Sequence, residues 1–250
     1  MRTSTLLRRN AMGLLALLGV LYCSANLLFA ASSERGHVWT THVFPQSAET
    51  WDWVHTNGLA MGSGGIWRYD DNLSRHAQVQ YILSQPKYER LADMSCSVGI
   101  QLEKMQRHNP GAEHFGSDIS RVMVDATRRR CPQCHAAQFD LGHFREAGAG
   151  YVFPGTFDYV IVSDVLIYIG WGGWPPIVLR YCAMCRTLVR PEQRRWLERV
   201  TALTRREIVF SPHQENPIAI DMLQALGAQR HAHYDIFIVN GTAARDALHA

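Results

Sequence analysis

The sequence contains no internal repeats, and it has no acidic residue before Glu34. The absence of repeats excludes a solenoid or a propeller. Neither sign of charge dominates, because 25 Lys and Arg residues stand against 22 Asp and Glu residues, for a net charge of +3. The basic runs at 128–130, 194–195 and 205–206 lie at predicted helix ends, where cations complement the helix dipole. The charge therefore gives no reason to expect a nucleic-acid partner, and 250 residues suffice for one α/β domain with small appendages.

The N-terminal residues 1–33 predict a signal anchor or a signal peptide. Arg2, Arg8 and Arg9 precede an apolar run over residues 11–31, which is long enough to cross a hydrocarbon core of about 30 Å. The small residues at 30–33 are also compatible with cleavage. With the basic flank in the cytosol, the domain would be membrane-anchored or in the secretory pathway. The lack of acids leaves import into an organelle as the alternative.

Residues 34–72 predict a linker and an irregular N-terminal cap, because the stretch 55–72 is dense in Gly, Asn and Asp. Residues 61–67 suit either an arm over a ligand or a loop with Trp67 docked on the core. The following segment, 72–85, places Val79, Ile82 and Leu83 at helical spacing and predicts a lead-in helix.

From residue 73 to residue 250 the sequence alternates between predicted strands and predicted helices, which indicates a parallel sheet covered on both faces. The expected fold class is a Rossmann-like three-layer α/β/α sandwich. We expect strands at 90–94, 112–118, 135–141, 157–169, 206–211 and 234–241. We expect helices at 99–108, 120–130, 191–204 and 216–227.

The turn "LADMSCSVG" carries the first candidate ligand-binding residues. Asp93 ends the first strand and Gly99 opens the next helix, with Ser95, Cys96 and Ser97 between them. Such small side chains let backbone N–H groups and a helix N-terminus approach a ligand closely. Taken alone, this pattern also fits a plain tight turn between a strand and a helix.

Further acids follow the next strands of the predicted sheet. Asp118 ends the second strand, at the distance from the small-residue turn that suits ribose hydroxyls. Asp140 ends the third strand, where an adenine amino group would bind, and Ser163 and Asp164 end the fourth. Because the carboxyl ends of parallel strands share one edge, these residues are expected to line one crevice.

On these motifs the chain resembles the class I S-adenosylmethionine-dependent methyltransferases over roughly residues 81–239. "LADMSCSVG" resembles their D-x-G-x-G-x-G motif with serine at two glycine positions, and "FDYVIVSDVLIYI" resembles their fourth motif, with Tyr168 in place of a frequent histidine. The resemblance implies S-adenosylmethionine as cofactor and an antiparallel C-terminal strand. The implied cofactor-binding residues are Asp93, Ser95, Cys96, Ser97, Gly99, Asp118, Ile119, Asp140, Leu141, Ser163 and Asp164.

Two other functions compete with methyl transfer. An NAD-type dehydrogenase shares this kind of fold, but the first turn lacks its full glycine fingerprint. A catalytically silent domain that binds or scaffolds is compatible with the two missing glycines. The pair Asn216-Pro217 is not at the end of the fourth strand, so it does not match the motif of nucleic-acid amino-methyltransferases.

The acceptor and the catalytic residue are not identified by the sequence. A base is needed only if the acceptor must lose a proton, and the candidates near the crevice are Asp164, Tyr168, His143 and His213. The long segment 170–189 suits a substrate lid with Trp171 and Trp174. The lid and the apolar N-terminus favour a small molecule, a lipid or a glycan as acceptor.

Two C-x-x-C pairs, Cys131 with Cys134 and Cys182 with Cys185, form the ligand set of a structural zinc site. The predicted fold places the first pair at the bottom of the sheet and the second after its top edge. Zinc, disulfides and free thiols all remain open, and a zinc-stabilised binding module is a third reading of the whole domain. Cys96 is expected to be a small packing residue.

Overall fold

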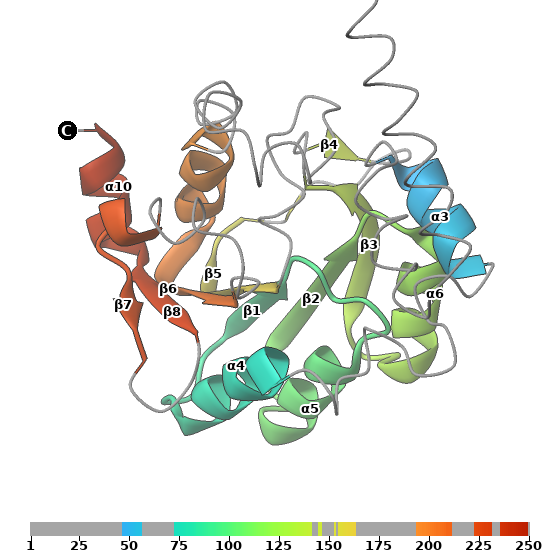
Figure 1. The fold of residues 1–250 in the computed structure, drawn as a ribbon. Helices are drawn as coiled ribbons and strands as arrows, with labels where there is room; N and C mark the ends of the chain where they lie inside the picture. The colour runs from blue at the N-terminus through green and yellow to red at the C-terminus, as the bar shows by residue number, and fades with distance from the viewer. Residues whose placement is uncertain are drawn as a thin grey trace, which may run out of the picture.

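The computed structural model describes residues 47–56, 73–141, 145–146, 153, 155–163, 194–211, 223–231 and 236–249. These residues form an eight-stranded sheet with the order β4-β3-β2-β1-β5-β6-β8-β7. Helices cover both of its faces (Figure 1). The predicted three-layer α/β/α architecture is therefore confirmed.

The strands of the described region are β1 (Arg90–Asp93), β2 (Glu113–Asp118), β3 (His135–Asp140), β4 (Arg145–Glu146), β5 (Phe157–Ser163), β6 (Thr204–Ser211), β7 (Gln229–Arg230) and β8 (Phe237–Asn240). The helices are α3 (Ala48–Thr56), α4 (Leu73–Ser84), α5 (Ile100–His108), α6 (Arg121–Arg130) and α10 (Gly241–His249). Residues 194–202 form a further helix before β6.

The sheet is parallel in its centre and antiparallel at its C-terminal edge. β1 lies between β2 and β5, and the pairs β2–β3 and β5–β6 extend the parallel part. β8 runs antiparallel to β6, and β7 runs antiparallel to β8. The antiparallel C-terminal strand that the resemblance implied is confirmed, and the carboxyl ends of β1, β2, β3 and β5 share one edge.

Two apolar clusters cover the two faces of the sheet, because successive strand residues point to opposite sides. On β1, Leu91 belongs to the cluster beneath α4 and α5, and its neighbour Ala92 belongs to the cluster beneath helix 194–202. On β5, Ile161 belongs to the cluster beneath α4 and α5, and Val162 belongs to the cluster beneath helix 194–202. All four residues are 0 to 1% exposed, so β1 and β5 form the buried centre of the fold.

Some of the predicted elements differ from the structure. Residues 48–56, predicted to be part of a linker and irregular cap, form α3, and residues 241–249 form α10. The edge strands β4 and β7, of two residues each, were not predicted. β5 is described as far as Ser163, so the rest of the predicted strand, 164–169, lies outside the described residues.

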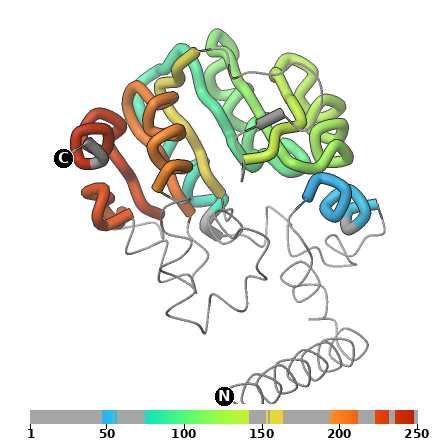
Figure 2. Tube along the Cα trace, turned by 90° about the horizontal axis from the view of Figure 1, so that it is seen from above, coloured from blue at the N-terminus to red at the C-terminus, as the bar shows by residue number. Residues whose placement is uncertain are grey.

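The short helices α3 and α10 lie at opposite ends of the sheet (Figure 2). α3 begins after Ser47, whose hydroxyl accepts a hydrogen bond from Thr50 N at 3.2 Å, an N-cap contact. α10 begins after Asn240, whose Oδ1 accepts hydrogen bonds from Thr242 N and Ala243 N at 3.1 and 3.0 Å. None of the helices in the described ranges is long and apolar enough to cross a membrane, and the apolar run 11–31 lies outside those ranges.

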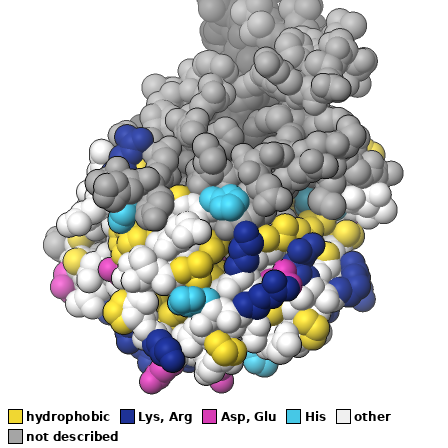
Figure 3. Space-filling model, turned by 90° about the horizontal axis from the view of Figure 1, so that it is seen from below, with side chains coloured by type: hydrophobic (Ala, Val, Ile, Leu, Met, Phe, Trp, Pro, Cys, Tyr) yellow, Lys and Arg dark blue, Asp and Glu magenta, His cyan; other side chains and the backbone are white. Residues whose placement is uncertain are grey.

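On the face drawn in Figure 3, several basic side chains lie beside acidic ones. At the start of β5 and β6, Arg205 and Arg206 approach Asp158 Oδ1 at 3.3 and 3.5 Å. Arg90 at the start of β1 pairs with Glu113 at 2.9 Å. The pair of Arg90 with Glu113 is exposed on the glutamate side, and such surface pairs typically contribute up to about 1 kcal/mol to stability, whereas Asp158 is buried.

Candidate functional site

The candidate site is built around the turn of residues 94–99, which joins β1 to α5. Its backbone remains attached to both neighbouring strands. Met94 N donates a hydrogen bond to Ile161 O of β5, and Cys96 N donates one to Ser117 O of β2, both at 2.9 Å. The turn is therefore held at the edge of the sheet where the strands end.

Two residues of the turn adopt left-handed backbone conformations, Ser97 with φ 50° and Gly99 with φ 78°. Gly99 also packs closely on α6, because a Cβ added there would lie 2.9 Å from Thr127 Cγ2. The Thr127 hydroxyl donates a hydrogen bond to Ser97 O at 2.8 Å. Thr127 of α6 thus contacts the turn at both Ser97 and Gly99. Glycine is required at position 99 by its positive φ angle and by the close approach of Thr127.

Gly116 of β2 allows a second close approach. A Cβ at this position would lie 3.0 Å from Leu102 Cδ2 and 3.1 Å from Cys96 Sγ. Cys96 is 2% exposed, and burial raises the pKa of its thiol. A buried thiol with a raised pKa is a poor nucleophile, so Cys96 packs the turn against β2, as predicted.

Asp118 at the end of β2 faces the turn. Its Oδ2 accepts a hydrogen bond from Ser97 N at 3.1 Å, and its Oδ1 accepts one from Ser120 N at 2.9 Å. Burial raises the pKa of this carboxyl to about 6, against the lowering effect of the two N–H groups. A carboxylate has about four acceptor positions, so Asp118 retains the capacity to accept further hydrogen bonds.

Asp93 at the end of β1 is fully buried. Its Oδ1 accepts a hydrogen bond from Ser95 N at 3.2 Å, whereas its Oδ2 finds no hydrogen-bond donor in the described part of the chain. Burial raises the pKa of Asp93 to about 6, and the nearby Arg75 opposes the rise. A buried carboxylate oxygen without a donor is unusual, because it loses its hydration without compensation.

The buried Asp93 predicts a characteristic pH dependence of stability. A carboxyl with a raised folded-state pKa stabilises the fold while it is protonated, and this contribution is lost as the pH rises from 3.8 to about 6. Chemical denaturation of wild type and Asp93→Asn at pH 4 and pH 7 should show wild type losing about 2 to 3 kcal/mol relative to the variant. Equal pH dependence in the two proteins would contradict this role.

Ser95 and Ser163 connect the ends of β1 and β5. The Ser95 hydroxyl donates to Ser163 O and accepts from Ser163 N, each at 3.0 Å. Both predicted residues are buried, at 5% and 1% exposure. The sequence placed them near each other but gave no indication that their contact would be direct.

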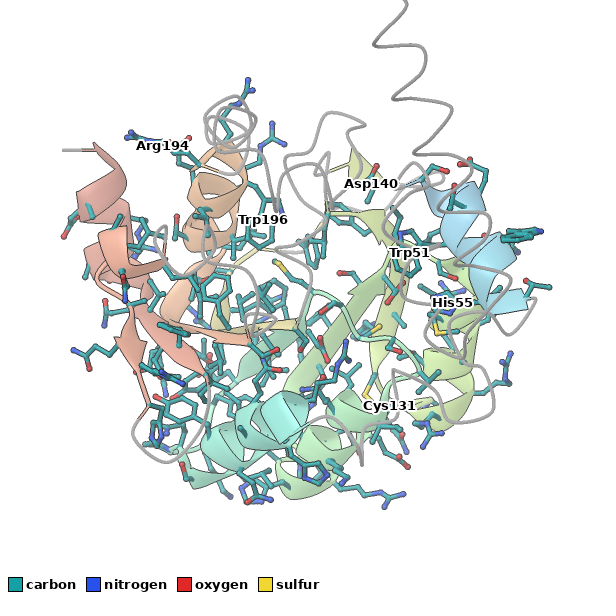
Figure 4. All side chains as sticks on the ribbon, in the orientation of Figure 1. Trp51, His55, Cys131, Asp140, Arg194 and Trp196 are labelled. Carbon is teal, nitrogen blue, oxygen red and sulfur yellow. A yellow bond between two sulfur atoms is a disulfide. The ribbon has the colours of Figure 1, made fainter. Side chains whose placement is uncertain are left out.

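Ile119, Asp140 and Leu141 lie around the end of β3. Asp140 is at the upper end of that strand (Figure 4) and is 6% exposed, and Leu141 is 7% exposed. The Gln138 amide donates a hydrogen bond to Ile119 O at 3.0 Å, which ties the segment after β2 to β3. Two apolar side chains and one carboxylate thus lie at the ends of β2 and β3, and their predicted contact with an adenine ring stays a prediction.

α3 is an unpredicted part of this region. Asp52 Oδ1 accepts hydrogen bonds from the Ser120 hydroxyl at 2.7 Å and from Val122 N at 3.3 Å, so it caps α6. Trp51 is 8% exposed and stacks on His55 with ring centroids 5.7 Å apart. Burial lowers the pKa of His55 to about 4. A signal for this helix was present, because Ser47 and Glu49 form an N-terminal capping pattern before the two tryptophans.

Three buried polar residues next to the turn were not among the predicted site residues. Arg75 and Gln78 of α4 and Gln101 of α5 are 6, 0 and 1% exposed. Arg75 and Gln78 stand three residues apart on the buried side of the helix. Polar residues at that spacing beside Val79 and Ile82 were the available signal, because a buried face is otherwise apolar.

Several predicted residues lie outside the described part of the chain: Asp164, Tyr168, His143, His213, Trp171, Trp174, Cys182, Cys185 and the segment 61–67. The candidate catalytic residues and the predicted lid therefore stay predictions. The first C-x-x-C pair is described, and Cys131 and Cys134 form a disulfide at the end of α6 with Cα atoms 5.3 Å apart. No cluster of metal-ligating side chains occurs within the described ranges.

Comparisons with known proteins give matches only to solved structures. No protein-family model matches the chain, and no curated protein matches it. The N-methyltransferase NodS from Bradyrhizobium japonicum WM9, solved with S-adenosylhomocysteine, matches at 17% identity and a TM-score of 0.44 over 64% of this chain and 72% of its own. A TehB-like methyltransferase from Corynebacterium glutamicum matches at 11% identity and a TM-score of 0.45 over 76% of this chain and 95% of its own.

An O-methyltransferase family protein from Burkholderia thailandensis matches at 13% identity and a TM-score of 0.49 over 78% of this chain. The match spans 62% of that protein, which is less than two thirds of its length. Without the short β4, the sheet of the present chain has the seven-strand order 3-2-1-4-5-7-6. The described residues thus form a mostly parallel α/β sheet with antiparallel C-terminal strands, the fold class that the resemblance to the class I S-adenosylmethionine-dependent methyltransferases implied.

Proposed function

We propose that this protein binds S-adenosylmethionine and transfers its methyl group to an acceptor. The observation that carries the proposal is the position of Asp118, a carboxylate at the end of β2 beside the small-residue turn. Its two oxygens are oriented by Ser97 N and Ser120 N and can still accept hydrogen bonds from the two ribose hydroxyls.

The other residues of the site fit the same ligand. Asp93 Oδ2, which has no hydrogen-bond donor among the described residues, suits the cationic methionine end of the molecule, because an opposite charge compensates a buried carboxylate. Ile119 and Leu141 offer apolar surface to the adenine ring, and Asp140 offers an acceptor to its amino group. The backbone N–H groups at the start of α5 complete the cradle.

S-adenosylmethionine supplies a methyl group on a positively charged sulfur, which a nucleophile of the acceptor attacks in line. The protein's contribution is to align the two partners and to exclude water. In this chain the turn 94–99, Asp118 and the end of β5 hold the cofactor side. A base is required only for an acceptor that must lose a proton.

We propose a small molecule, a lipid or a glycan as acceptor, with the protein attached to a membrane by its apolar residues 11–31. A domain held at a membrane surface meets lipid-linked substrates at high local concentration. This part of the proposal is supported by the sequence of the N-terminus and by the absence of a nucleic-acid methyltransferase motif after β5.

The cofactor is tested by calorimetric titration of the full chain, in detergent, with S-adenosylmethionine, S-adenosylhomocysteine and NAD⁺. We expect one-to-one binding of the first two with dissociation constants on the order of 10 μM, and no binding of NAD⁺. Folded protein that binds neither sulfur compound would refute the proposal and favour a silent scaffold. Binding of NAD⁺ alone would favour a dehydrogenase.

A further inference from the structure

The two serines that replace motif glycines are not equivalent in the structure. Ser97 has a φ angle of 50° and is the one residue other than glycine with a positive φ in the described ranges. A glycine would suit that conformation better. Ser95 has an ordinary backbone conformation, so nothing in the backbone requires glycine at position 95.

The Ser95 side chain makes a contact that glycine cannot make. Its hydroxyl bonds both the N–H and the carbonyl of Ser163, which lies 68 residues further along the chain. The parallel pairing of β1 with β5 ends at Asp93 and Ile161. The hydroxyl therefore continues the connection between the two strands beyond their last paired residues, at the edge of the candidate site.

A buried network supports this connection from below. The Ser163 hydroxyl donates to Gln78 Oε1 at 2.7 Å, and the Gln78 amide donates to Val162 O and Val209 O at 3.1 and 2.9 Å. Gln78 thereby holds the carbonyls of β5 and β6 at their carboxyl ends. It is completely buried, so these bonds are not exchanged with water.

Gln101 of α5 and Arg75 of α4 connect this network to the turn. Gln101 Nε2 donates to Gln78 Oε1 at 3.2 Å, and an Arg75 amino group donates to Gln101 Oε1 at 3.2 Å. The same Arg75 group lies 3.4 Å from Ser95 O. Ser95 is thus held through its carbonyl on one side and through its hydroxyl on the other.

We infer that Ser95, through Ser163, is a positioning residue that keeps the ends of β1 and β5 in the arrangement that binds S-adenosylmethionine. The inference rests on the proposed function. The family motif has glycine at the position of Ser95, which suggests that glycine there would favour cofactor binding. The inference has the opposite consequence, that Ser95→Gly weakens cofactor binding. Loss of the hydroxyl removes two hydrogen bonds at buried atoms and lets the two strand ends move apart.

The test compares two substitutions of the same kind in the full chain, Ser95→Gly and, as the control, Ser84→Gly at the last residue of α4. Both add the same backbone freedom to the unfolded chain. S-adenosylmethionine and S-adenosylhomocysteine are titrated by calorimetry at a temperature well below the unfolding midpoint of each variant. We expect Ser95→Gly to weaken the binding of both at least about tenfold, as for the loss of a buried hydrogen bond.

Ser84→Gly should not weaken binding, because the Ser84 hydroxyl donates to Tyr81 O within α4. Ser97→Gly should raise the unfolding midpoint, because glycine relieves the left-handed conformation. Ser95→Ala should weaken binding in the same direction as Ser95→Gly, since it also lacks the hydroxyl. A purely structural role would lower the midpoint of Ser95→Gly but leave the affinity of the folded protein unchanged, and that result would overturn the inference. Failure of wild type itself to bind would instead refute the proposed function.

Discussion

Replacing Asp118 by asparagine is expected to lower the affinity for S-adenosylmethionine about 100-fold. Two hydrogen bonds from ribose hydroxyls to a carboxylate together contribute about 3 kcal/mol. Asparagine offers one acceptor oxygen, and its NH₂ group would face Ser97 N or Ser120 N, which are donors themselves. The affinity is measured by calorimetry on the full chain, with folding checked by circular dichroism.

The ribose is common to cofactor and product, so S-adenosylhomocysteine should lose affinity by the same factor. Asp125→Asn is the matched control, because this substitution removes the same charge on the exposed side of α6. Asp125 pairs there with Arg121 and Arg128. Its binding should equal that of wild type. If Asp118→Asn binds within about threefold of wild type, Asp118 does not hold the ribose and a different ligand must be sought.

The central strands and the acids at their ends were predictable from the sequence. The run at 157–163 is fully buried in the sheet, and such strands read as continuous apolar segments. Asp93, Asp118 and Asp140 are each the last residue of a strand, so the alternation of strand and helix was sufficient to bring them to one edge. These positions can be predicted from local sequence, because each aspartate is placed by the strand at whose end it stands.

α3 was not predictable in the same way, because a helix of nine residues is marginal by itself. It is stabilised by contacts of Asp52 with Ser120 and Val122, 68 and 70 residues away. The Gln78 contacts with Val162 and Val209 span 84 and 131 residues. A single sequence does not reveal contacts between residues so far apart. The contact of the Ser95 hydroxyl with Ser163, 68 residues away, is of the same kind, and it distinguishes Ser95 from Ser97.

Replacing Gly99 by alanine is expected to lower the free energy of unfolding by about 3 kcal/mol. An alanine at φ 78° is strained by about 1 to 2 kcal/mol, and its Cβ would lie 2.9 Å from Thr127 Cγ2 and 3.0 Å from Thr127 Cα. The side chain can rotate but the backbone atom cannot, so α5 and α6 must separate, as in an overpacked core. The turn that carries Ser97 and Cys96 moves with them, and cofactor binding should fall together with stability.

Gly227 provides the control that separates the two causes. It has φ 73°, close to that of Gly99, but a Cβ there would meet no atom within 4 Å. Gly227→Ala should therefore show the conformational penalty alone, about 1 to 2 kcal/mol. Urea denaturation of both variants gives the close-packing contribution as the difference between them. Equal losses at the two positions would mean that α6 does not press on the turn, and Thr127 would then lose its role as the support of the cofactor site.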